Sequence, residues 1–281
     1  MSYDRMVEKE KQLKAEVKQL LEQAEAADAE EDSRYGKERR GDELPAELER
    51  RETRLKAIQE AKRTLQARAR EKAVDEGSDP KQAKPKDTDQ YNFTDPESRI
   101  MKGADGFVQA DNAQAVVEPD FQLIVGQTVT QAANDKEQLT PMMDVVEQQS
   151  GQRPEAVLAD SGYCSEKNLE DLESVAKPER RIEGYIATER QKHDEYREAC
   201  PRGPLPKDAT RVDRMRRKLK TKVGKAVYAA RKAIVEPVFG QIKQARGFRQ
   251  FLLRGIEKVR GEWSLVCLTH NILKCYRLCY E

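Results

Sequence analysis

Residues 155–163, EAVLADSGY, hold the segment that decides how the chain folds. A short apolar run, AVLA, is followed by Asp160 and then by Ser161 and Gly162, which permit a sharp turn. An apolar run of this length that is bounded by turn residues is typical of a buried strand. The segment therefore predicts a strand that leads directly into Asp160 and places its carboxylate at the carboxyl end of the strand.

Helix and strand patterns alternate on both sides of this strand. Residues 135–151 have the periodicity of an amphipathic helix, and residues 165–175 predict a second helix with Ser165 as its N-cap. Residues 182–188, IEGYIAT, predict a further strand. This alternation is typical of a sheet on which helices pack.

The preceding region has the pattern of an antiparallel start. Residues 91–95, YNFTD, predict a short first strand, and residues 108–130 predict two strands that turn at Glu118-Pro119-Asp120. From residue 211 the pattern is helical almost to the end of the chain. These features together predict an α/β fold in which helices flank a mixed sheet.

The N-terminal part has a different pattern, that of two charged helices. Residues 5–33 and about 45–74 predict helices with narrow apolar stripes, which would pair as an antiparallel hairpin. Such a hairpin serves either as a solvated spacer or as an arm that grips DNA. We expect a charged helical arm over residues 1–74, a polar linker over 75–91, and the α/β domain over 92–281.

The formal net charge of +1 conceals a strong asymmetry along the chain. Residues 1–80 carry about −3, residues 81–200 about −10, and residues 201–281 about +14. A C-terminal third this basic favours a polyanionic partner, most simply nucleic acid. An acidic middle beside a basic flank suits metal-dependent phosphodiester chemistry.

Membrane and secreted classes find no support in the sequence. No apolar run approaches the length that spans a bilayer, and the first residues lack an apolar signal segment. The five Cys are an odd number without a disulfide-scaffold pattern, so we expect a reducing cytoplasm.

The C-terminal helix contains a Cys and His group that invites a zinc interpretation. Cys267, His270, Cys275 and Cys279 lack the spacing of a tight two-Cys knuckle, and Cys often packs as a small apolar residue. We therefore expect this helix to be a core element. The side chains expected to bury it against the sheet are those of Trp263, Leu265, Val266, Leu268 and Ile272.

Three acidic residues stand at positions that suit a metal site. Asp95 ends the predicted first strand, Asp160 follows the strand AVLA, and Glu236 lies among apolar residues in RKAIVEPVFGQIK, residues 231–243. A carboxylate on an apolar face is costly unless a cation pairs with it. If the three carboxylates converge at strand ends, they could hold two divalent metal ions, with Glu236 facing the sheet.

Each of these residues also has a simpler explanation. Asp95 and Asp160 could be ordinary turn residues, and Glu236 could pair with Lys232, one helical turn before it. Pro237 disfavours helical geometry at Glu236 and predicts a helix start or a kink there. On spacing alone, the metal site and these alternatives both stay open.

A dense cationic face runs through residues 211–232, RVDRMRRKLKTKVGKAVYAARK. Arg216, Arg217 and Lys218 lie within it, and few acidic residues balance them. A solvated helix is one explanation of such a run. We favour contact with DNA phosphates, which positions the duplex without reading its sequence.

Three segments resemble bacterial insertion-sequence transposases of the DDE class, of the insertion-sequence 1182 type. They are NFTDPESRIMK at 92–102, VLADSGYCSEKNLEDL at 157–172, and the block from RKAIVEPVFG to THNILK at 231–274. The resemblance implies a ribonuclease-H-like core that binds two Mg²⁺ or Mn²⁺ ions and acts on transposon ends and target DNA. It also implies a homo-oligomer on DNA in the bacterial cytoplasm, at the nucleoid, and an N-terminal domain absent from this chain.

The resemblance assigns roles to the acidic residues. By it, Asp160 is the second Asp of the catalytic and metal-binding triad, Glu236 is the Glu, and Asp95 is the first Asp, with Asp111 as its rival. Asp95 is preferred because the first strand should precede the antiparallel pair.

The resemblance also points to DNA-binding residues around Glu236. Related transposases carry Tyr, Arg, Glu and Lys with two, three and six intervening residues. Lys243 keeps the gap of six after Glu236, and Tyr228 is present. Arg231, however, leaves four residues before Glu236, and Lys232 restores the gap of three, so which cation touches phosphate stays open.

The sequence thus predicts the catalytic region of a DNA transposase, which cleaves DNA at transposon ends and transfers the strand into target DNA. The alternative is a catalytically inactive DNA-binding remnant. A purely structural helical protein is disfavoured because the middle of the chain is rich in strand patterns.

Overall fold

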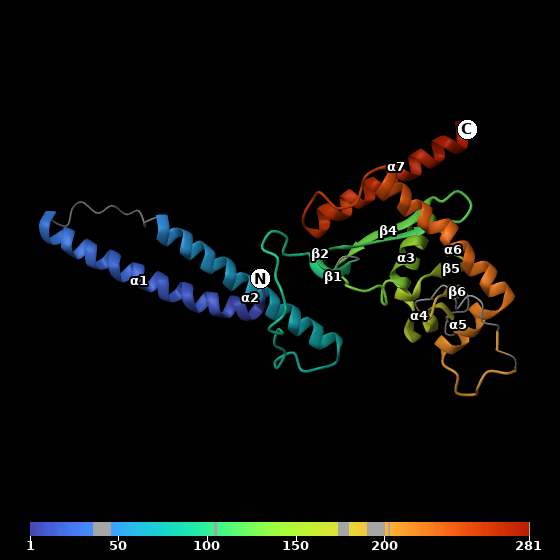
Figure 1. Ribbon diagram of the computed structural model, residues 1–281, viewed down its shortest axis with the longest axis horizontal. Coiled ribbons are helices and arrows are strands. Elements are labelled where there is room, and N and C mark those ends of the chain that lie inside the picture. The colour runs from blue at the N-terminus through green and yellow to red at the C-terminus, as the bar shows by residue number, and fades with distance from the viewer. Residues whose placement is uncertain (36–45, 104–105, 174–179, 190–199, 202, 281) are drawn as a thin grey trace. The chain divides into compact units, whose positions relative to one another are not determined.

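The computed structural model describes residues 1–35, 46–103, 106–173, 180–189, 200–201 and 203–280. The chain divides into two compact units, Met1–Pro96 and Glu97–Glu281 (Figure 1). Within the described ranges, no helix combines the length and the apolarity that a membrane crossing requires.

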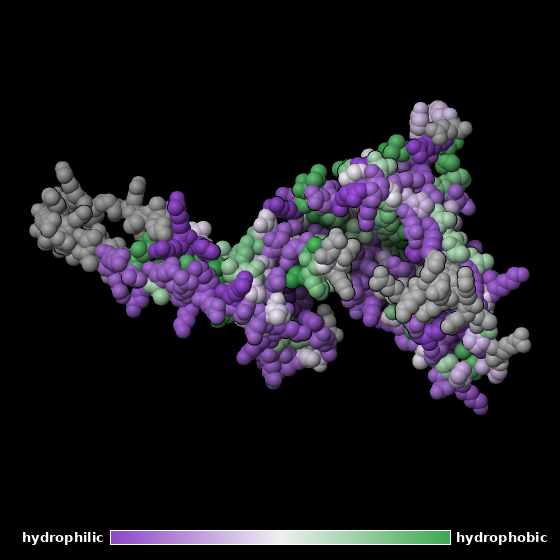
Figure 2. Space-filling view, viewed as in Figure 1, coloured by the Kyte–Doolittle hydropathy of each residue, from purple (hydrophilic) through white to green (hydrophobic). Residues whose placement is uncertain are grey.

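The N-terminal unit is built on two long antiparallel helices, α1 (Tyr3–Tyr35) and α2 (Ala46–Asp75) (Figure 1). Their facing side is apolar, and its buried side chains are those of Met6, Leu13, Ile58, Ala61 and Leu65. On the face seen in Figure 2, most of the coloured surface over these helices is hydrophilic (purple). Ion pairs join the helices beside the narrow core, from Glu10 to Lys62 at 2.5 Å and from Glu16 to Arg51 at 3.2 Å.

The polar segment after α2 folds back onto the start of α1. Gln90 forms a β-bridge with Ser2, and the backbone N–H of Tyr91 donates to the carbonyl of Met1 at 3.0 Å. The Tyr91 ring completes the core between the helices. This segment is therefore part of the N-terminal unit.

The predicted strand at residues 91–95 is wrong. The Asn92 side chain accepts a hydrogen bond from the backbone N–H of Thr94 at 3.0 Å, and this local turn replaces strand pairing. Among the described residues, the first strand is instead β1 (Arg99–Gly103), which pairs with β2 (Gly106–Ala110) in an antiparallel hairpin.

The C-terminal unit continues with alternating strands and helices, which confirms the predicted α/β class. The antiparallel pair β3 (Asn112–Val117) and β4 (Ile124–Thr130) is followed by α3 (Leu139–Ser150). Then come β5 (Ala156–Ala159), a short 3-10 helix η1 (Ser161–Tyr163), α4 (Glu166–Glu173) and β6 (Glu183–Ile186). Within the described residues the strands form three two-stranded sheets, of which β5 and β6 are the parallel pair.

The last third is helical, as the sequence predicts. It comprises α5 (Arg211–Lys220), α6 (Lys222–Gly240), a π-helix η4 (Gln241–Ala245) and α7 (Ile256–Tyr280). The sequence predicts either a helix start or a kink at Glu236; helix α6 runs through Pro237, so the helix start is wrong. Because Pro237 has no N–H for the carbonyl of Ala233, the Gln122 side chain donates to that carbonyl instead, at 2.9 Å.

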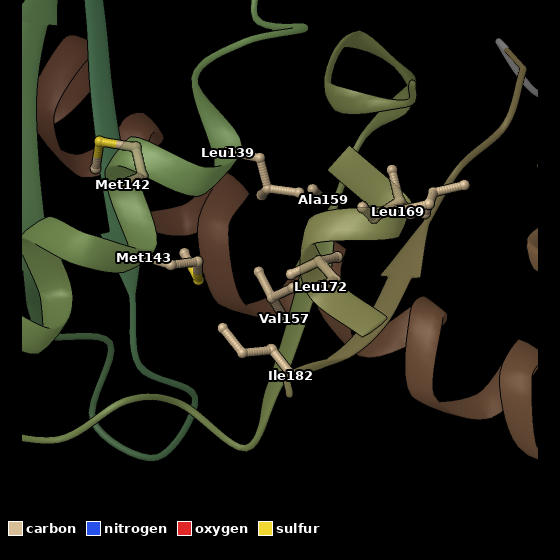
Figure 3. Close-up of a cluster of buried hydrophobic side chains, with 9 residues drawn as sticks. Leu139, Met142, Met143, Val157, Ala159, Leu169, Leu172 and Ile182 are labelled. Carbon is tan, nitrogen blue, oxygen red and sulfur yellow. The ribbon is translucent and has the colours of Figure 1, made fainter. Parts of the chain in front are cut away.

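Two large apolar clusters lie in this unit, beside a smaller one formed by Tyr185, Ala187, Leu219 and Tyr228. One lies between α3, α4, β5 and β6, where the side chains drawn in Figure 3 converge: Leu139, Met142, Met143, Val157, Ala159, Leu169, Leu172 and Ile182. The other packs β3 and β4 against α6 and α7, with Ile124, Val129, Val238, Ile242, Val259, Trp263 and Val266 at its centre. The Trp263 indole N–H also donates to the carbonyl of Gln114 at 3.0 Å, which fixes α7 on β3.

The prediction for α7 is correct for only part of its apolar side chains. Trp263 and Val266 are buried, as expected, whereas Leu265, Leu268 and Ile272 are exposed. One side of α7 therefore packs on the sheet and the other faces solvent. Of the Cys and His group on this helix, Cys267 and His270 are buried, while Cys275 and Cys279 are exposed.

Candidate active site

Asp160 lies where the sequence predicts, immediately after β5. Its backbone is extended, with φ −80° and ψ −178°, and its side-chain Oδ1 accepts a hydrogen bond from the backbone N–H of Gly162 at 2.9 Å. The parallel partner of β5 is β6, in the register Ala159 to Ile186. Because parallel strands end at the same edge, Asp160 stands at the kind of edge where α/β proteins build their sites.

A second carboxylate, that of Asp135, faces the same turn. Asp135 lies in the segment between β4 and α3. A Cβ atom built on Gly162 would be 3.0 Å from Asp160 Oδ1 and 3.1 Å from Asp135 Oδ2. The missing side chain of Gly162 therefore leaves a small cradle that the two carboxylates share.

Two amides from β3 hold the Asp135 carboxylate in place. Asn112 and Gln114 lie two residues apart on the strand, so their side chains emerge on one face. Asn112 Nδ2 and Gln114 Nε2 each donate to Asp135 Oδ1 at 2.7 Å, and Gln114 Nε2 also donates to Asn112 Oδ1 at 2.8 Å. Because Gln114 is only 3% exposed, the network has a fixed anchor in the core.

The Tyr163 hydroxyl completes this network, and the charges of both carboxylates affect its pKa. It donates to Gln114 Oε1. Burial raises the pKa of Tyr163 well above its ordinary value, and the negative charges of Asp135 and Asp160 raise it further, against a smaller opposing effect of the Gln114 hydrogen bond. The phenol therefore stays protonated at neutral pH and remains a hydrogen-bond donor.

Asn168 joins the two segments that carry the carboxylates. Its buried side-chain Nδ2 donates to the carbonyls of Lys136, at 2.6 Å, and Tyr163, at 2.7 Å. The predicted N-cap is confirmed beside it, because the Ser165 hydroxyl accepts from the backbone N–H of Asn168 at 3.1 Å. The start of α4 thus sets the spacing between the Asp135 segment and the Asp160 turn.

Glu236 differs from the expectation of a carboxylate on an apolar face. Its side chain is 57% exposed, while Val238, two residues on, enters the core. Glu236 Oε1 forms an ion pair with Arg231 Nη2 at 3.5 Å. The buried apolar side chain next to Glu236 therefore lies on another side of α6. The Glu236 carboxylate is paired with a cation of the protein.

The predicted triad is distributed over both units. Asp95 belongs to the N-terminal unit, and Asp111, between β2 and β3, belongs to the C-terminal unit with Asp160 and Glu236. Across the described residues, no three His, Cys, Asp or Glu side chains gather closely enough to form a metal-binding group. The roles of Asp95, Asp160 and Glu236 thus stay predictions.

The three cations of α5 that the sequence predicts to bind DNA have partners within the chain. Arg216 pairs with Asp213 at 2.8 Å and Glu189 at 2.6 Å. Lys218 pairs with Glu183 at 3.0 Å and lies 3.8 Å from the centre of the Tyr185 ring. Arg217 donates to the carbonyl of Gly203. A DNA phosphate would compete with these carboxylates and carbonyls.

The residues around Glu236 have mixed surroundings. Tyr228 is 7% exposed and packs in a cluster with Tyr185 and Leu219, and the Arg231 guanidinium lies 5.7 Å from its ring centre. Lys232 is exposed, and the Lys243 ammonium lies 5.3 Å from the centre of the Phe239 ring. The exposed cations near Glu236 are thus better placed to meet a phosphate than the Tyr228 side chain.

Sequence reasoning missed Asp135. One signal could have found it, because Asp135, like Asp160, lies in a segment that leads from a strand to a helix, although Asp160 follows β5 directly and Asp135 lies further beyond β4. Its position directly ahead of a helical pattern instead marked it as the start of that helix. Its proximity to Asp160 depends on Asn112, Gln114 and Asn168, and no local pattern shows this.

Comparison with known proteins adds an independent finding. Residues 196–276 match the family model described as the transposase DDE domain. No curated protein and no solved structure gives a significant match. The matched range spans α5, α6, η4 and most of α7, and it includes Glu236. This match supports a transposase of the DDE class.

Proposed function

We propose that this chain is the catalytic region of a DNA transposase of the insertion-sequence 1182 type, with a ribonuclease-H-like core. It cleaves DNA at transposon ends and transfers the strand into target DNA. The observation that carries the proposal is the match of residues 196–276 to the transposase DDE domain. The position of Asp160 at the end of β5, with its carboxylate fixed by the Gly162 N–H, supports it.

The donor atoms at Asp160 fit a divalent metal ion. The cradle over Gly162 brings together oxygens of two carboxylates, and Mg²⁺ and Mn²⁺ prefer such hard oxygen ligands. In the proposal, Asp95, Asp160 and Glu236 hold two ions, with Asp111 as the alternative to Asp95. Two such ions supply Lewis acidity to the phosphodiester that is attacked and to its leaving oxygen.

The chain's own residues bind and orient the DNA. Arg231, Lys232 and Lys243 lie on the helical segment that carries Glu236, and they would hold phosphates beside the carboxylates. In the free chain Arg231 accompanies Glu236. When DNA arrives, the Arg231 guanidinium would exchange this carboxylate for a phosphate oxygen, which releases Glu236 for a metal ion.

The proposal also includes the substrate, the oligomeric state and the place in the cell. The substrate is double-stranded DNA, and Arg216, Arg217 and Lys218 on α5 extend the cationic surface along it. The protein acts as a homo-oligomer on DNA in the bacterial cytoplasm, at the nucleoid.

The test is a cleavage and strand-transfer assay with Mg²⁺ or Mn²⁺ on the protein and its Asp160→Asn variant. We expect metal-dependent nicking of a transposon-end duplex by the wild type and its loss in the variant. Asp120→Asn, the same chemical change in the exposed turn between β3 and β4, serves as the control and keeps full activity. Cleavage that survives Asp160→Asn contradicts the assignment.

A DNA-binding chain without catalysis is the second candidate. It is favoured by the absence, among the described residues, of three metal-ligating side chains close together. Such a chain binds duplex DNA with an affinity that falls steeply as salt rises, yet never cuts it. Binding with no product in Mg²⁺ or Mn²⁺ identifies this case.

A further inference from the structure

We propose that Asp135 is a further ligand of the divalent cation held by Asp160, so that the ion sits over Gly162 between the two carboxylates. The inference rests on the proposed function, from which it takes a Mg²⁺ or Mn²⁺ site at Asp160. It adds a ligand from a different segment, the one between β4 and α3, to those that the sequence assigns.

The charges around Gly162 call for a cation. Asp135 Oδ2 and Asp160 Oδ1 each lie about 3 Å from the same point above Gly162, so the two negative groups are neighbours. Like charges this close are unfavourable unless a positive charge lies between them. Within the described part of the chain, neither carboxylate forms an ion pair with Lys, Arg or His. A divalent ion from solvent supplies the missing charge.

The groups that hold Asp135 are neutral, and they leave one oxygen directed at the cradle. The Asn112 and Gln114 amides both donate to Oδ1, which turns Oδ2 toward Gly162. Tyr163, whose pKa is raised by burial, stays neutral too. Outer groups of this kind orient a ligand without cancelling its charge, as the neighbours of metal ligands do in other proteins.

The site is formed before the ion arrives. Asp135 is anchored to β3, Asp160 to its own turn, and Asn168 ties the two segments together. Asp160 is exposed and Asp135 half-buried, so an ion has access from solvent. A preformed arrangement loses little conformational freedom on binding, which favours affinity.

The experiment is a Mn²⁺ titration of the full chain followed by electron paramagnetic resonance, with and without duplex DNA. The variants are Asp135→Asn and Asp160→Asn, and Asp120→Asn is the matched control. Asp135→Asn keeps an oxygen in place but removes the charge, so we expect Mn²⁺ affinity to fall about tenfold or more, with the control unchanged.

The outcomes separate the two proposals. If Asp135→Asn binds Mn²⁺ like the wild type while Asp160→Asn does not, the inference about Asp135 fails and the proposed function stands. If the wild type binds no Mn²⁺ even with duplex present, the proposed metal site fails and the inference fails with it.

Thermal unfolding distinguishes a ligand from a merely structural residue. If Asp135 is a ligand, the rise in Tm that Mn²⁺ gives the wild type is lost in Asp135→Asn. The Tm of the metal-free variant should not be lower than that of the metal-free wild type, since the substitution removes the repulsion between the two carboxylates. A lower metal-free Tm with an unchanged Mn²⁺ shift identifies a structural role and overturns the inference.

A second variant tests the cradle without altering either carboxylate. In Gly162→Ala the new methyl group would lie 3.0 Å from Asp160 Oδ1 and 3.1 Å from Asp135 Oδ2, where the ion is placed. We expect Mn²⁺ affinity to fall several-fold. Gly261→Ala on α7, where a Cβ meets nothing within 4 Å, is the matched control. Wild-type affinity in Gly162→Ala contradicts the placement of the ion.

Discussion

Gln122 and Ala233 are joined by a hydrogen bond that spans 111 positions of the sequence. The Gln122 side-chain Nε2 donates to the Ala233 carbonyl at 2.9 Å, in the position where the N–H of residue 237 would stand if it were not proline. The Gln122 side-chain Oε1 accepts from the Lys274 ammonium at 2.8 Å, and the backbone carbonyl oxygen of Gln122 lies 3.1 Å from His270 Nε2. One turn residue between β3 and β4 therefore binds both α6 and α7.

Replacement of Gln122 should destabilise the C-terminal unit. Gln122→Ala removes the donor to Ala233, and we expect a loss of about 1–2 kcal/mol in the free energy of unfolding. Gln122 also has a positive φ of 60°, a conformation that favours glycine. Gln122→Gly loses the same hydrogen bonds but relieves this strain, so it should be less harmful. Urea unfolding compares the two variants, and equal stabilities would contradict the strain at this position.

Local signals carried much of the fold. The strand AVLA, the N-cap at Ser165 and the turn between β3 and β4 all lie where the sequence predicts them, because each depends on residues a few positions apart. The strand expected at 91–95 failed for a local reason as well, since the Asn92 side chain competes for the backbone there.

The failures at longer range have a common cause. Pro237 predicts a helix start or a kink at Glu236, and the helix start is wrong: α6 continues because Gln122, distant in sequence, supplies the missing donor. The sequence does not predict Asp135 as a site residue for the same reason, that the deciding contacts are distant in sequence. The side-chain amides of β3 and Asn168 hold Asp135 beside Asp160. The sequence predicts apolar surroundings for Glu236 because its neighbours in the chain are apolar, but the sequence alone does not show which side of α6 faces solvent.

The buried and the exposed cysteines of α7 should differ in how fast they react with thiol reagents. Burial raises the pKa of Cys267 to about 12, so its thiolate fraction at pH 8 is on the order of one in ten thousand. Cys275 and Cys279 are exposed on the same helix. In the native chain, a thiol reagent such as Ellman's should modify these two rapidly and leave Cys267 unmodified. A Cys267→Ser variant should keep the full rapid phase, and loss of a rapidly reacting thiol in it would show that Cys267 is accessible.

The stability of the C-terminal unit should depend on pH through His270. Burial lowers the pKa of His270 below its ordinary 6.5, so the unfolded chain binds a proton more readily than the folded chain. The contribution of this neutral histidine is therefore complete above pH 6.5 and is lost progressively as the pH falls below that value.

The variant that isolates this effect is His270→Gln, which cannot titrate yet retains a donor for the Gln122 carbonyl. Urea unfolding between pH 8 and pH 5 should show a smaller loss of stability with acid in the variant than in the wild type. Parallel pH profiles for the two proteins would assign the acid sensitivity to other groups.

The tie through Asn168 should control both the stability of the unit and the metal affinity of the site. Asn168→Ala leaves the carbonyls of Lys136 and Tyr163 without their donor, and an unsatisfied buried acceptor costs about 1–3 kcal/mol. Because the two segments that carry Asp135 and Asp160 then separate more freely, Mn²⁺ affinity should fall together with stability.

A neighbouring substitution provides the control for this coupling. Lys167→Ala changes an exposed side chain on the same turn of α4, so unfolding and Mn²⁺ binding should both stay within error of the wild type. Mn²⁺ affinity that is unchanged in Asn168→Ala, despite the lower stability, would mean that the carboxylates hold their positions without the tie. The amides of Asn112 and Gln114 would then be sufficient to hold Asp135 beside Asp160, and their replacement would be the next test of the site.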